Sequence, residues 1–382
     1  MRRSQVVTGP TRGHTLAAPP QGGALSIQPN NFDLLRLFAA LQVVVLHTWE
    51  HLELPTGGFA GSLRTLLSFF PGVPIFFVIS GFLISRSWER SHDLKSYARN
   101  RFIRIYPALW AALAVSLILL VTLGALSLSN LGQASFWAWL VAQLSFGQFY
   151  NPAFLRDFGV GVVNGSLWTI PVELAFYAFL PVFYTFGVDR ASPRTSRIVT
   201  GMLFVGSFAA FLVTTEGSGT SRSFVAKALN VTLAPHLYMF MLGMGLQRNL
   251  QFVERWLAGR AVVWLAALVS FMVSIHLAGE KPAWSFAPIV FVHRMLLAMT
   301  TLSCAYSARS LANRWLRGAD VSYGAYLYHM LVVNLLVDLG LGKGSSSGLV
   351  AVLTGTLALA GLSWHYVEHP SLRRKTRSLR PL

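Results

Sequence analysis

The chain alternates between long apolar segments and short polar connections from about residue 31 to residue 370. Ten of the apolar segments contain 18 or more residues, and one, at 135–149, is shorter. Because a helix rises about 1.5 Å per residue, roughly 20 residues cross the apolar core of a bilayer. The pattern therefore predicts an all-α membrane protein, a polytopic bundle of about ten transmembrane helices. The longer segments are approximately 33–51, 66–85, 105–128, 166–187, 198–215, 230–247, 261–278, 286–308, 320–340 and 348–367.

The basic residues of the connections set the expected topology and the course of segment 135–149. If that segment does not cross the bilayer, 23 of the 31 Lys and Arg residues fall on one side of the membrane and six on the other. The positive-inside rule assigns the richer side to the cytoplasm. If the segment crossed, every later basic cluster would move outside. We therefore expect both termini in the cytoplasm and a short re-entrant or interfacial helix at 135–149.

The composition favours a single membrane domain. Hydrophobic residues make up 54% of the chain and charged residues 12%, whereas charged residues are about a quarter of a soluble domain. The net charge of +17 lies in short clusters between apolar segments, which disfavours nucleic acid and favours anionic lipid or an anionic substrate as partner. The single cysteine excludes an intrachain disulfide, and no metal is expected. We expect a disordered cytoplasmic tail at 1–30, a membrane domain at 31–370 and a basic cytoplasmic tail at 371–382.

Several ionisable side chains lie inside apolar segments, where they are costly and usually functional. Arg36 and His47 are eleven residues apart, about 16 Å along one helix. With the predicted topology, His47 shares a layer in the outer half of the membrane with Glu173, His293 and Arg294. Two simpler interpretations stay open at this point: Arg36 extends to the cytoplasmic headgroups, and His293 pairs locally for packing.

Other polar groups recur in short stretches along the chain. Two arginines three residues apart at the cytoplasmic mouth of the third segment would lie on one helical face, and guanidinium groups bind phosphate in a bidentate manner. The alternative for this pair is ordinary positive-inside charge. The stretches are GVPIFFVISGFLIS at 72–85, RFIRIYP at 101–107, NGSLWTIPVELAFY at 164–177, DVSYGAYLYH at 320–329 and WHYVEHP at 364–370.

Taken together and in this order, these stretches resemble the integral-membrane acyltransferase family 3, which contains many bacterial O-acetyltransferases of cell-surface polysaccharides. The resemblance covers about residues 30 to 372. It implies transfer of an acyl group, usually acetyl from acetyl-coenzyme A, to a glycan hydroxyl in the bacterial inner membrane, with separate polysaccharide-synthesis proteins and membrane lipid as further partners. One block departs from the family, because the glycines expected around Arg36 are missing from Asp33-Leu34-Leu35-Arg36-Leu37.

By motif match, the resemblance implies a role for each candidate residue. His47 would be the catalytic base, with Arg36 and Glu173 as essential partners within the membrane. Arg101 and Arg104 would contact coenzyme A on the cytoplasmic side. We expect neutral His47 to deprotonate the acceptor hydroxyl, Glu173 to position the imidazole or the hydroxyl, and Arg36 to line the path of the donor. Substrate binding or structural support is expected from Asp33, Ser80, Trp168, Tyr328, His329 and Glu368.

A transporter or flippase for a glycan or lipid precursor is the alternative class, because it would equally explain ten helices with charges inside the membrane. The two halves of the chain show no internal similarity, which disfavours it. A serine nucleophile is a weaker alternative. Residues 344–348 match G-x-S-x-G, but the strand and helix that a nucleophile elbow requires are absent from the pattern.

Overall fold

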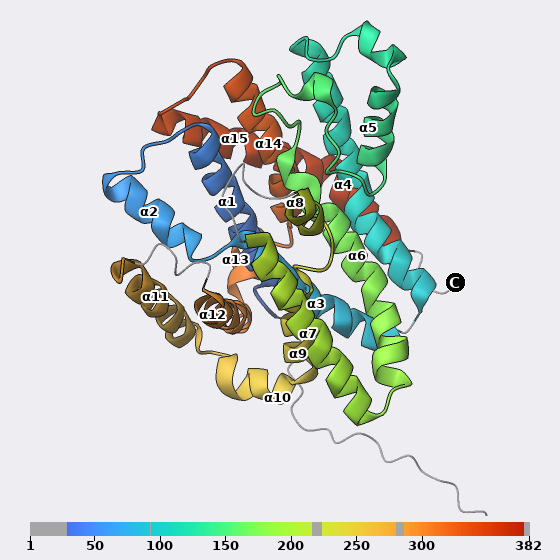
Figure 1. Cartoon of the computed structure of the whole chain (residues 1–382), viewed down its shortest axis with the longest axis vertical. Helices are drawn as coiled ribbons and strands as arrows, with labels where there is room; N and C mark the ends of the chain where they lie inside the picture. Colours follow the sequence, from blue (N-terminus) through green and yellow to red (C-terminus); the bar gives the residue numbers. More distant parts are fainter. Residues whose placement is uncertain (1–28, 92, 216–223, 280–285, 378–382) are drawn as a thin grey trace, which may run out of the picture.

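Helices account for all the regular secondary structure in the residues that the computed structural model describes, which are 29–91, 93–215, 224–279 and 286–377. Figure 1 shows them as a bundle of long helices with shorter ones at its ends. The α-helices are α1 (Phe32–His51), α2 (Gly58–Ser68), α3 (Gly72–Ser91), α4 (Leu94–Thr122), α5 (Ala134–Leu144), α6 (Thr169–Val182), α7 (Pro193–Thr215), α8 (Phe224–Asn230), α9 (Leu237–Arg248), α10 (Leu250–Phe252), α11 (Ala261–Leu277), α12 (Ala287–Ala305), α13 (Leu311–Leu316), α14 (Ser322–Asp338), α15 (Ser346–Ser363) and α16 (His369–Arg377).

The predicted all-α membrane fold is confirmed, and the predicted count of ten spans is approximate. Within the described residues, seven helical segments are long and apolar enough to cross a membrane. The other three predicted spans correspond to α9, α11 and α14, which contain 12, 17 and 17 residues. α9 and α14 are largely buried, because longer helices surround them. α11 follows a sharp bend of 81° after the segment Leu250–Leu257.

The short apolar segment at 135–149 forms α5, a helix of 11 residues. Its length is about 16 Å, roughly half the apolar thickness of a bilayer. Two hydrogen bonds attach its end to α4: Tyr106 Oη donates to the Ser145 carbonyl at 3.0 Å, and Trp110 Nε1 donates to the Leu144 carbonyl at 3.1 Å. The helix therefore lies along α4 and is too short to cross the membrane.

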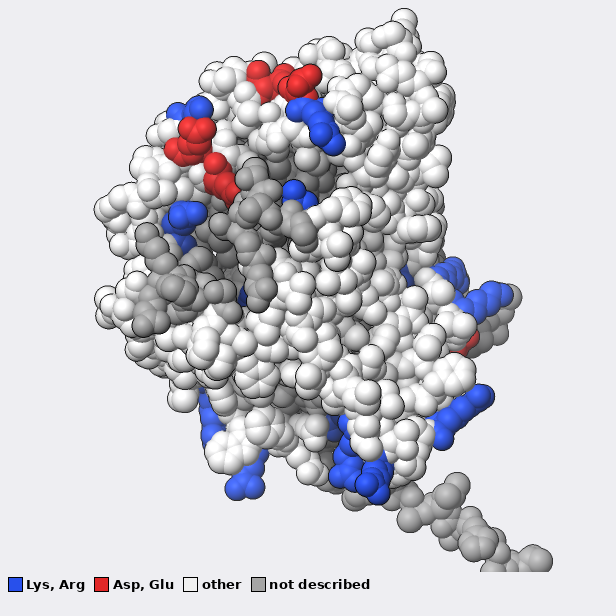
Figure 2. Space-filling view, viewed as in Figure 1, with Lys and Arg blue, Asp and Glu red and all other residues white. Residues whose placement is uncertain are grey.

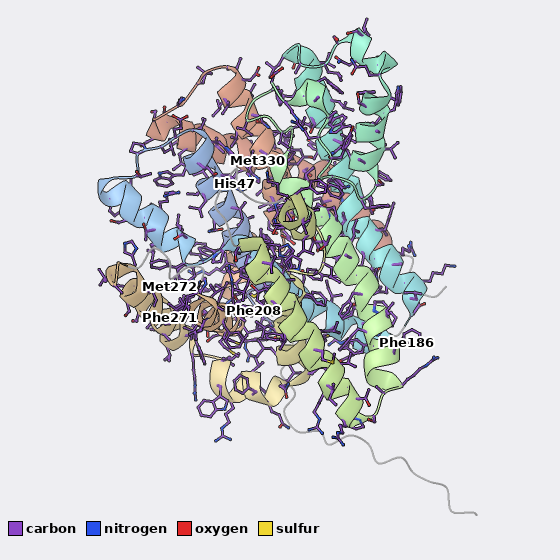
Figure 3. The ribbon with its side chains drawn as sticks, in the orientation of Figure 1. His47, Phe186, Phe208, Phe271, Met272 and Met330 are labelled. Atoms are coloured by element: carbon purple, nitrogen blue, oxygen red, sulfur yellow. The ribbon has the colours of Figure 1, made fainter. Side chains whose placement is uncertain are left out.

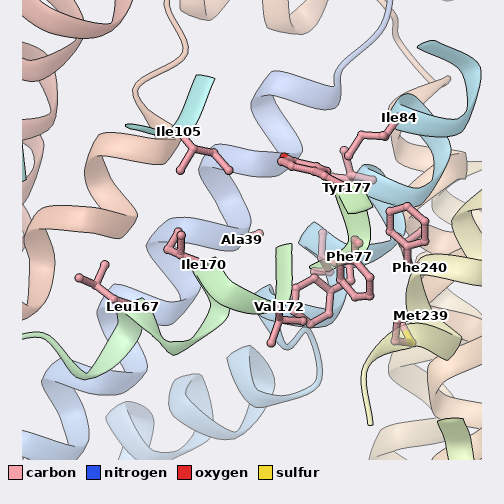
Figure 4. Packing of buried hydrophobic residues seen from close by; sticks show 14 of the residues in the cluster. Ala39, Phe77, Ile84, Ile105, Leu167, Ile170, Val172, Tyr177, Met239 and Phe240 are labelled. Carbon is pink, nitrogen blue, oxygen red and sulfur yellow. The ribbon is translucent and has the colours of Figure 1, made fainter. Parts of the chain in front are cut away.

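α3 and α9 pack closely because glycines face the partner helix at their contact. A Cβ atom on Gly81 would collide with the backbone carbonyl of Phe240, and one on Gly243 would collide with that of Val78. The ring of Phe176 on α6 stacks on Phe240, with centroids 4.6 Å apart. Figure 4 shows this apolar layer, in which side chains from α3, α6 and α9 meet. Close packing of this kind gives the helices around the site fixed positions.

Charged side chains lie mainly at the two ends of the bundle. Figure 2 shows Lys and Arg gathered at the end where α10 and the start of α7 lie and again beside the start of α4, a broad band with few charges, and most of the Asp and Glu in this view, mixed with Lys and Arg, near the opposite end. We call these the basic end and the acidic end. α1 begins near the basic end, because the Asn31 side-chain amide donates to the carbonyl of Ser307 at 2.6 Å after α12. The uncharged band is the part of the surface that suits lipid.

The two predicted tails lie largely outside the described residues. Of the segment at 1–30, only the last two residues are described. The segment at 371–382 begins as regular helix, because α16 extends to Arg377. Residues 378–382 lie outside the described part of the chain.

Candidate active site

A cavity opens among α1, α3, α4, α6 and α14 and encloses about 1010 Å³ of space, counting its open mouth. Its wall follows α6 from Thr169 to Tyr177, eight residues or about 12 Å. Five of the predicted site residues line it: Arg36, Ser80, Arg101, Arg104 and Glu173. The polar and charged lining consists of Arg36, Ser80, Asn100, Arg101, Arg104, Thr169, Glu173, Tyr177, Ser322, Tyr323 and Tyr326.

Arg101 and Arg104 reach the cavity from the first turns of α4. Asp93 caps the helix, since its carboxylate accepts hydrogen bonds from the backbone N–H groups of Lys95 and Ser96. This capping satisfies donors that would otherwise be unpaired at the helix start. Two residues spaced i and i+3 lie on the same face, as the sequence predicts, and the face turns toward α6 and α14.

Arg104 is held by two carboxylates. Its Nη2 atom lies 2.5 Å from Asp320 Oδ2, and its Nη1 atom lies 4.0 Å from Glu368 Oε2. Both acidic side chains are buried, with 10% and 3% of their surface exposed. Glu368 also accepts a hydrogen bond from Ser363 at 3.1 Å, and its ion pair with Arg104 joins the segment after α15 to α4. The positive charge of Arg104 is therefore already matched inside the protein.

Asp320 also joins Arg36 to this network. Arg36 Nη1 lies 3.2 Å from Asp33 Oδ1 and 3.8 Å from Asp320 Oδ2. Ser322 donates from its hydroxyl to Asp320 at 2.5 Å. Asp320 is the first residue of the DVSYGAYLYH stretch and was not among the predicted site residues. Its position at the start of the predicted span, two residues before Ser322, is the signal that could have identified it.

Arg101 differs from its neighbour because no carboxylate within the described residues lies at ion-pair distance from it. Its guanidinium lies over the rings of Tyr97 and Tyr177, 5.6 and 5.5 Å from their centroids. Its Nε atom is buried and has no hydrogen-bond partner. Tyr177 in turn donates a hydrogen bond to Glu173. Two tyrosine rings, one of them held by an acid, thus orient a cation whose charge is available to an anion.

His47 lies beside His329, where α1 contacts α14. His47 Nδ1 is 2.9 Å from His329 Nε2, and the ring planes are tilted by only 27°. His329 is completely buried, and its Nδ1 lies 2.8 Å from the backbone carbonyl of Tyr326. Figure 3 shows His47 on α1 close to Met330, the residue after His329. His47 itself is only partly buried, so one edge of its ring can be reached.

The deep end of the cavity and the histidine pair share a residue. Tyr326 lines the cavity with its side chain, and its hydroxyl forms a 2.8 Å hydrogen bond with Thr169. Its backbone carbonyl holds His329 one helical turn further toward the acidic end. The cavity therefore extends from the arginines to within one turn of the histidines.

The ionisable side chains predicted to share one layer lie in three places. His47 pairs with His329, whereas Glu173 lines the cavity with the arginines. His293 and Arg294 line a second cavity with residues of α2 and α7. His293 Nε2 lies 2.9 Å from the Phe69 carbonyl, and the Arg294 guanidinium lies over the ring of Phe211. The structure thus brings His329, rather than Glu173, into contact with His47.

The remaining predicted residues support the two groups. Asp33 pairs with Arg36, Glu368 pairs with Arg104, and Ser80 lines the cavity. Trp168 precedes α6 and packs on the ring of His236, with centroids 5.2 Å apart. Tyr328 is buried in the core. Within the described residues, no group of three or more His, Cys, Asp or Glu side chains is arranged to hold a metal ion.

Comparison with known proteins identifies the class. The model of the acyltransferase 3 family, described as an acyltransferase domain, matches residues 30–365. The chain is 33% identical over 360 residues to nodulation protein 10 of Rhizobium leguminosarum bv. viciae, covering 91% of this chain and 94% of that protein. It is 26% identical over 362 residues to the O-acetyl transferase of Shigella phage Sf6, covering 92% and 98%.

A more distant relative is the peptidoglycan O-acetyltransferase OatA of Listeria monocytogenes, 23% identical over 360 residues. The alignment covers 89% of this chain and 55% of OatA, so the chain spans about half the length of that relative. No solved structure matches the chain.

The helical bundle with its basic cavity defines a multi-pass membrane protein, and the family defines its chemistry. The chain belongs to the acyltransferase 3 family. It is an acyltransferase, which confirms the resemblance drawn from the motifs and decides against the transporter considered from the sequence.

Proposed function

We propose that this chain transfers an acyl group, most simply acetyl, from acyl-coenzyme A to a hydroxyl group of a cell-surface or exported glycan. The observation that carries the proposal is the cavity that extends from Arg101, a cation without a carboxylate partner in the described chain, to Tyr326, whose backbone carbonyl holds His329 of the histidine pair. Two relatives are named O-acetyl transferases, one of them for peptidoglycan, and these names support acetyl as the group and a glycan as the acceptor.

The proposed orientation follows from charge. The basic end faces the cytoplasm, both termini are cytoplasmic, and the membrane is the bacterial inner membrane. Coenzyme A is made in the cytoplasm, so its anionic head reaches the mouth of the cavity where Asn100, Arg101 and Leu372 lie. The acceptor approaches His47 from the acidic end.

Arg101 is the proposed phosphate contact of the donor. Its guanidinium is oriented by Tyr97 and Tyr177 and is not matched by an acid of the described chain. Arg104 and Arg36 line the same cavity but are paired with Asp320. They form part of the cavity wall, and the carboxylate partly neutralises their positive charge. Glu173 acts on the donor side as well, because it holds the hydroxyl of Tyr177.

In the transfer step, His47 takes the proton of the acceptor hydroxyl while the oxygen attacks the thioester carbonyl. The new C–O bond forms, the C–S bond breaks, and the leaving thiolate takes the proton back from the imidazolium. The products are the O-acyl glycan and the free thiol, and the imidazole is neutral again. General-base catalysis of this kind is typically worth about 10² to 10⁴ in rate.

Mass spectrometry of surface glycans from a deletion strain tests the proposal. Deletion should remove an acyl mass increment from one glycan, and a plasmid carrying the wild-type chain should restore it. A plasmid carrying His47→Ala, made to the same level in the membrane, should not. An unchanged glycan profile in the deletion strain, together with no acyl transfer from labelled acetyl-coenzyme A by the purified protein, would rule the proposal out.

A further inference from the structure

Two consecutive hydrogen bonds connect His47, through His329, to the backbone of α14. The carbonyl of Tyr326 lies 2.8 Å from His329 Nδ1, and His329 Nε2 lies 2.9 Å from His47 Nδ1. Both distances are normal for hydrogen bonds between nitrogen and a neighbouring acceptor. The Tyr326 carbonyl at the end of these hydrogen bonds determines which ring nitrogens carry protons.

A carbonyl oxygen can only accept a hydrogen bond, so His329 Nδ1 must carry a proton. A neutral imidazole carries one N–H and one bare nitrogen. His329 Nε2 is therefore the bare nitrogen and accepts, which means that His47 Nδ1 must donate. The second nitrogen of His47, Nε2, then has no proton and is free to act as a base.

The opposite arrangement would need a charged His329. If His329 were an imidazolium it could donate to both neighbours, and His47 would then carry its proton on Nε2. His329 is completely buried, and its two ring nitrogens face a carbonyl and another imidazole. Burying a charge without an opposite charge is costly. Of the ionisable side chains near the pair, His51 lies 6.0 Å from His47 and offers no negative charge, and the carboxylate of Glu50 acts on His47 and His51 but not on His329.

We propose that His329 is a positioning residue that fixes the tautomer and the ring orientation of His47, so that Nε2 of His47 meets the acceptor hydroxyl as an unprotonated base. The inference rests on the proposed function, in which His47 is the base of the acyl transfer. It adds a second histidine and a backbone carbonyl to the site. A carboxylate commonly holds a catalytic histidine from behind, whereas here the support is neutral throughout.

The same hydrogen bonds also hold His47 when it is an imidazolium during the reaction. When Nε2 of His47 takes the proton of the hydroxyl, Nδ1 keeps its own proton and still donates to His329. The imidazolium is therefore hydrogen-bonded on its buried side while its Nε2–H faces the leaving thiolate. No proton has to move through His329.

Two substitutions at position 329 separate this role from packing. His329→Leu removes the acceptor for His47 Nδ1–H, and His329→Gln keeps an acceptor oxygen in the side chain. We expect His329→Leu to lower kcat by about 10²-fold or more with the donor KM unchanged, and His329→Gln to recover most of the loss. His293→Leu is the matched control, because it removes another buried histidine that bonds to a backbone carbonyl in the second cavity. It should leave kcat close to the wild-type value.

A direct readout is nitrogen NMR of the full-length protein in lipid nanodiscs, with ¹⁵N-labelled histidine and with His47 assigned from a His47→Gln sample. In the wild type we expect a protonated Nδ1 and a bare Nε2 on His47. In His329→Leu we expect a mixture of tautomers. A proton on Nε2 in the wild type would overturn the proposal, as would equal losses of kcat in the Leu and Gln variants with an unchanged His47 spectrum.

The spectrum also separates this inference from the proposed function. It reports the tautomer even in the absence of any substrate. If no donor supports transfer but His47 has a bare Nε2 that depends on His329, the acyl-transfer proposal fails and the positioning remains. If transfer is normal in His47→Ala, the base assignment fails, and the positioning has no catalytic consequence.

Discussion

The carboxylate of Asp320 lies 2.5 Å from the guanidinium of Arg104 and 3.8 Å from that of Arg36, so one acid holds two arginines from different helices. Arg101, one turn from Arg104 on the same helix, is instead held by aromatic rings. Two arginines that look equivalent in the sequence therefore have different surroundings in the structure.

Removing the Arg101 charge should weaken donor binding. A charged hydrogen bond is typically worth about 1.5 to 3 kcal/mol, so Arg101→Ala should raise the donor KM roughly ten- to a hundredfold. The folded protein should keep its melting temperature, since no carboxylate of the described chain loses a partner. Kinetics with labelled acetyl-coenzyme A and a thermal unfolding curve measure the two effects. Unchanged donor kinetics in folded Arg101→Ala would remove Arg101 from the donor site.

Removing Arg104 should act mainly on stability. Arg104→Ala leaves Asp320 and Glu368 buried without their partner, and breaking a buried ion pair costs about 3 to 5 kcal/mol. We expect a lower melting temperature and less protein in the membrane. Combining Arg104→Met with Asp320→Asn and Glu368→Gln should recover part of the loss. A melting temperature equal to that of the wild type in Arg104→Ala would contradict this assignment.

His47→Ala should abolish catalysis while leaving the donor site intact. The expected loss of kcat is about 10² to 10⁴. Isothermal titration with coenzyme A should give an affinity close to that of the wild type, because the arginines line the cavity and His47 lies outside it, beside His329. If labelled acyl groups accumulated covalently on the wild-type chain, a two-step route through an acyl-enzyme would replace direct transfer.

Glu173→Gln tests whether Glu173 acts on donor binding or on the catalytic base. Because Glu173 holds Tyr177 and through it Arg101, the substitution should raise the donor KM and change kcat little. Tyr177→Phe removes this hydrogen bond altogether, whereas Glu173→Gln keeps an amide oxygen that accepts it without a charge, so Tyr177→Phe should raise the donor KM at least as much. A fall in kcat with unchanged KM in Glu173→Gln would instead support the sequence-based expectation that Glu173 positions the imidazole or the hydroxyl.

Gly81→Ala tests the packing that fixes the cavity wall. The new methyl group would collide with the Phe240 backbone, and overpacking of this kind typically costs about 1 to 3 kcal/mol. Gly245→Ala, on the partner helix α9, adds a methyl group that meets nothing within 4 Å and is the matched control. The melting temperature of Gly81→Ala should fall below that of Gly245→Ala. Equal values would mean that α3 and α9 separate easily.

The helices were predictable because the bilayer imposes a length on apolar segments. Seven of the ten predicted spans pass the same test in the structure, and the other three correspond to helices that are too short for it. For α9 and α14 this is understandable, since neighbouring helices surround them and lipid does not fix their length. The pattern of hydropathy contains no information about which helix is central.

The candidate residues were found from sequence, but their grouping was not. Depth along a helix could be estimated, and on that basis Glu173 seemed to share a layer with His47. The rotation of each helix about its axis decides which side chains meet, and the sequence does not give that rotation. The contact between His47 and His329 depends on it, and so does the pairing of Asp320 with two arginines.

The burial of α14 has a consequence for how the protein responds to its lipid. Twelve of the 17 residues in this helix are buried, among them His329 and Tyr326. A helix that lipid chains hardly touch does not have to tilt or stretch when the bilayer becomes thicker or thinner, unlike helices at the periphery. Changes in fatty-acid length during growth or cold adaptation would be absorbed by the outer helices, while the spacing between the histidine pair and the cavity stays constant.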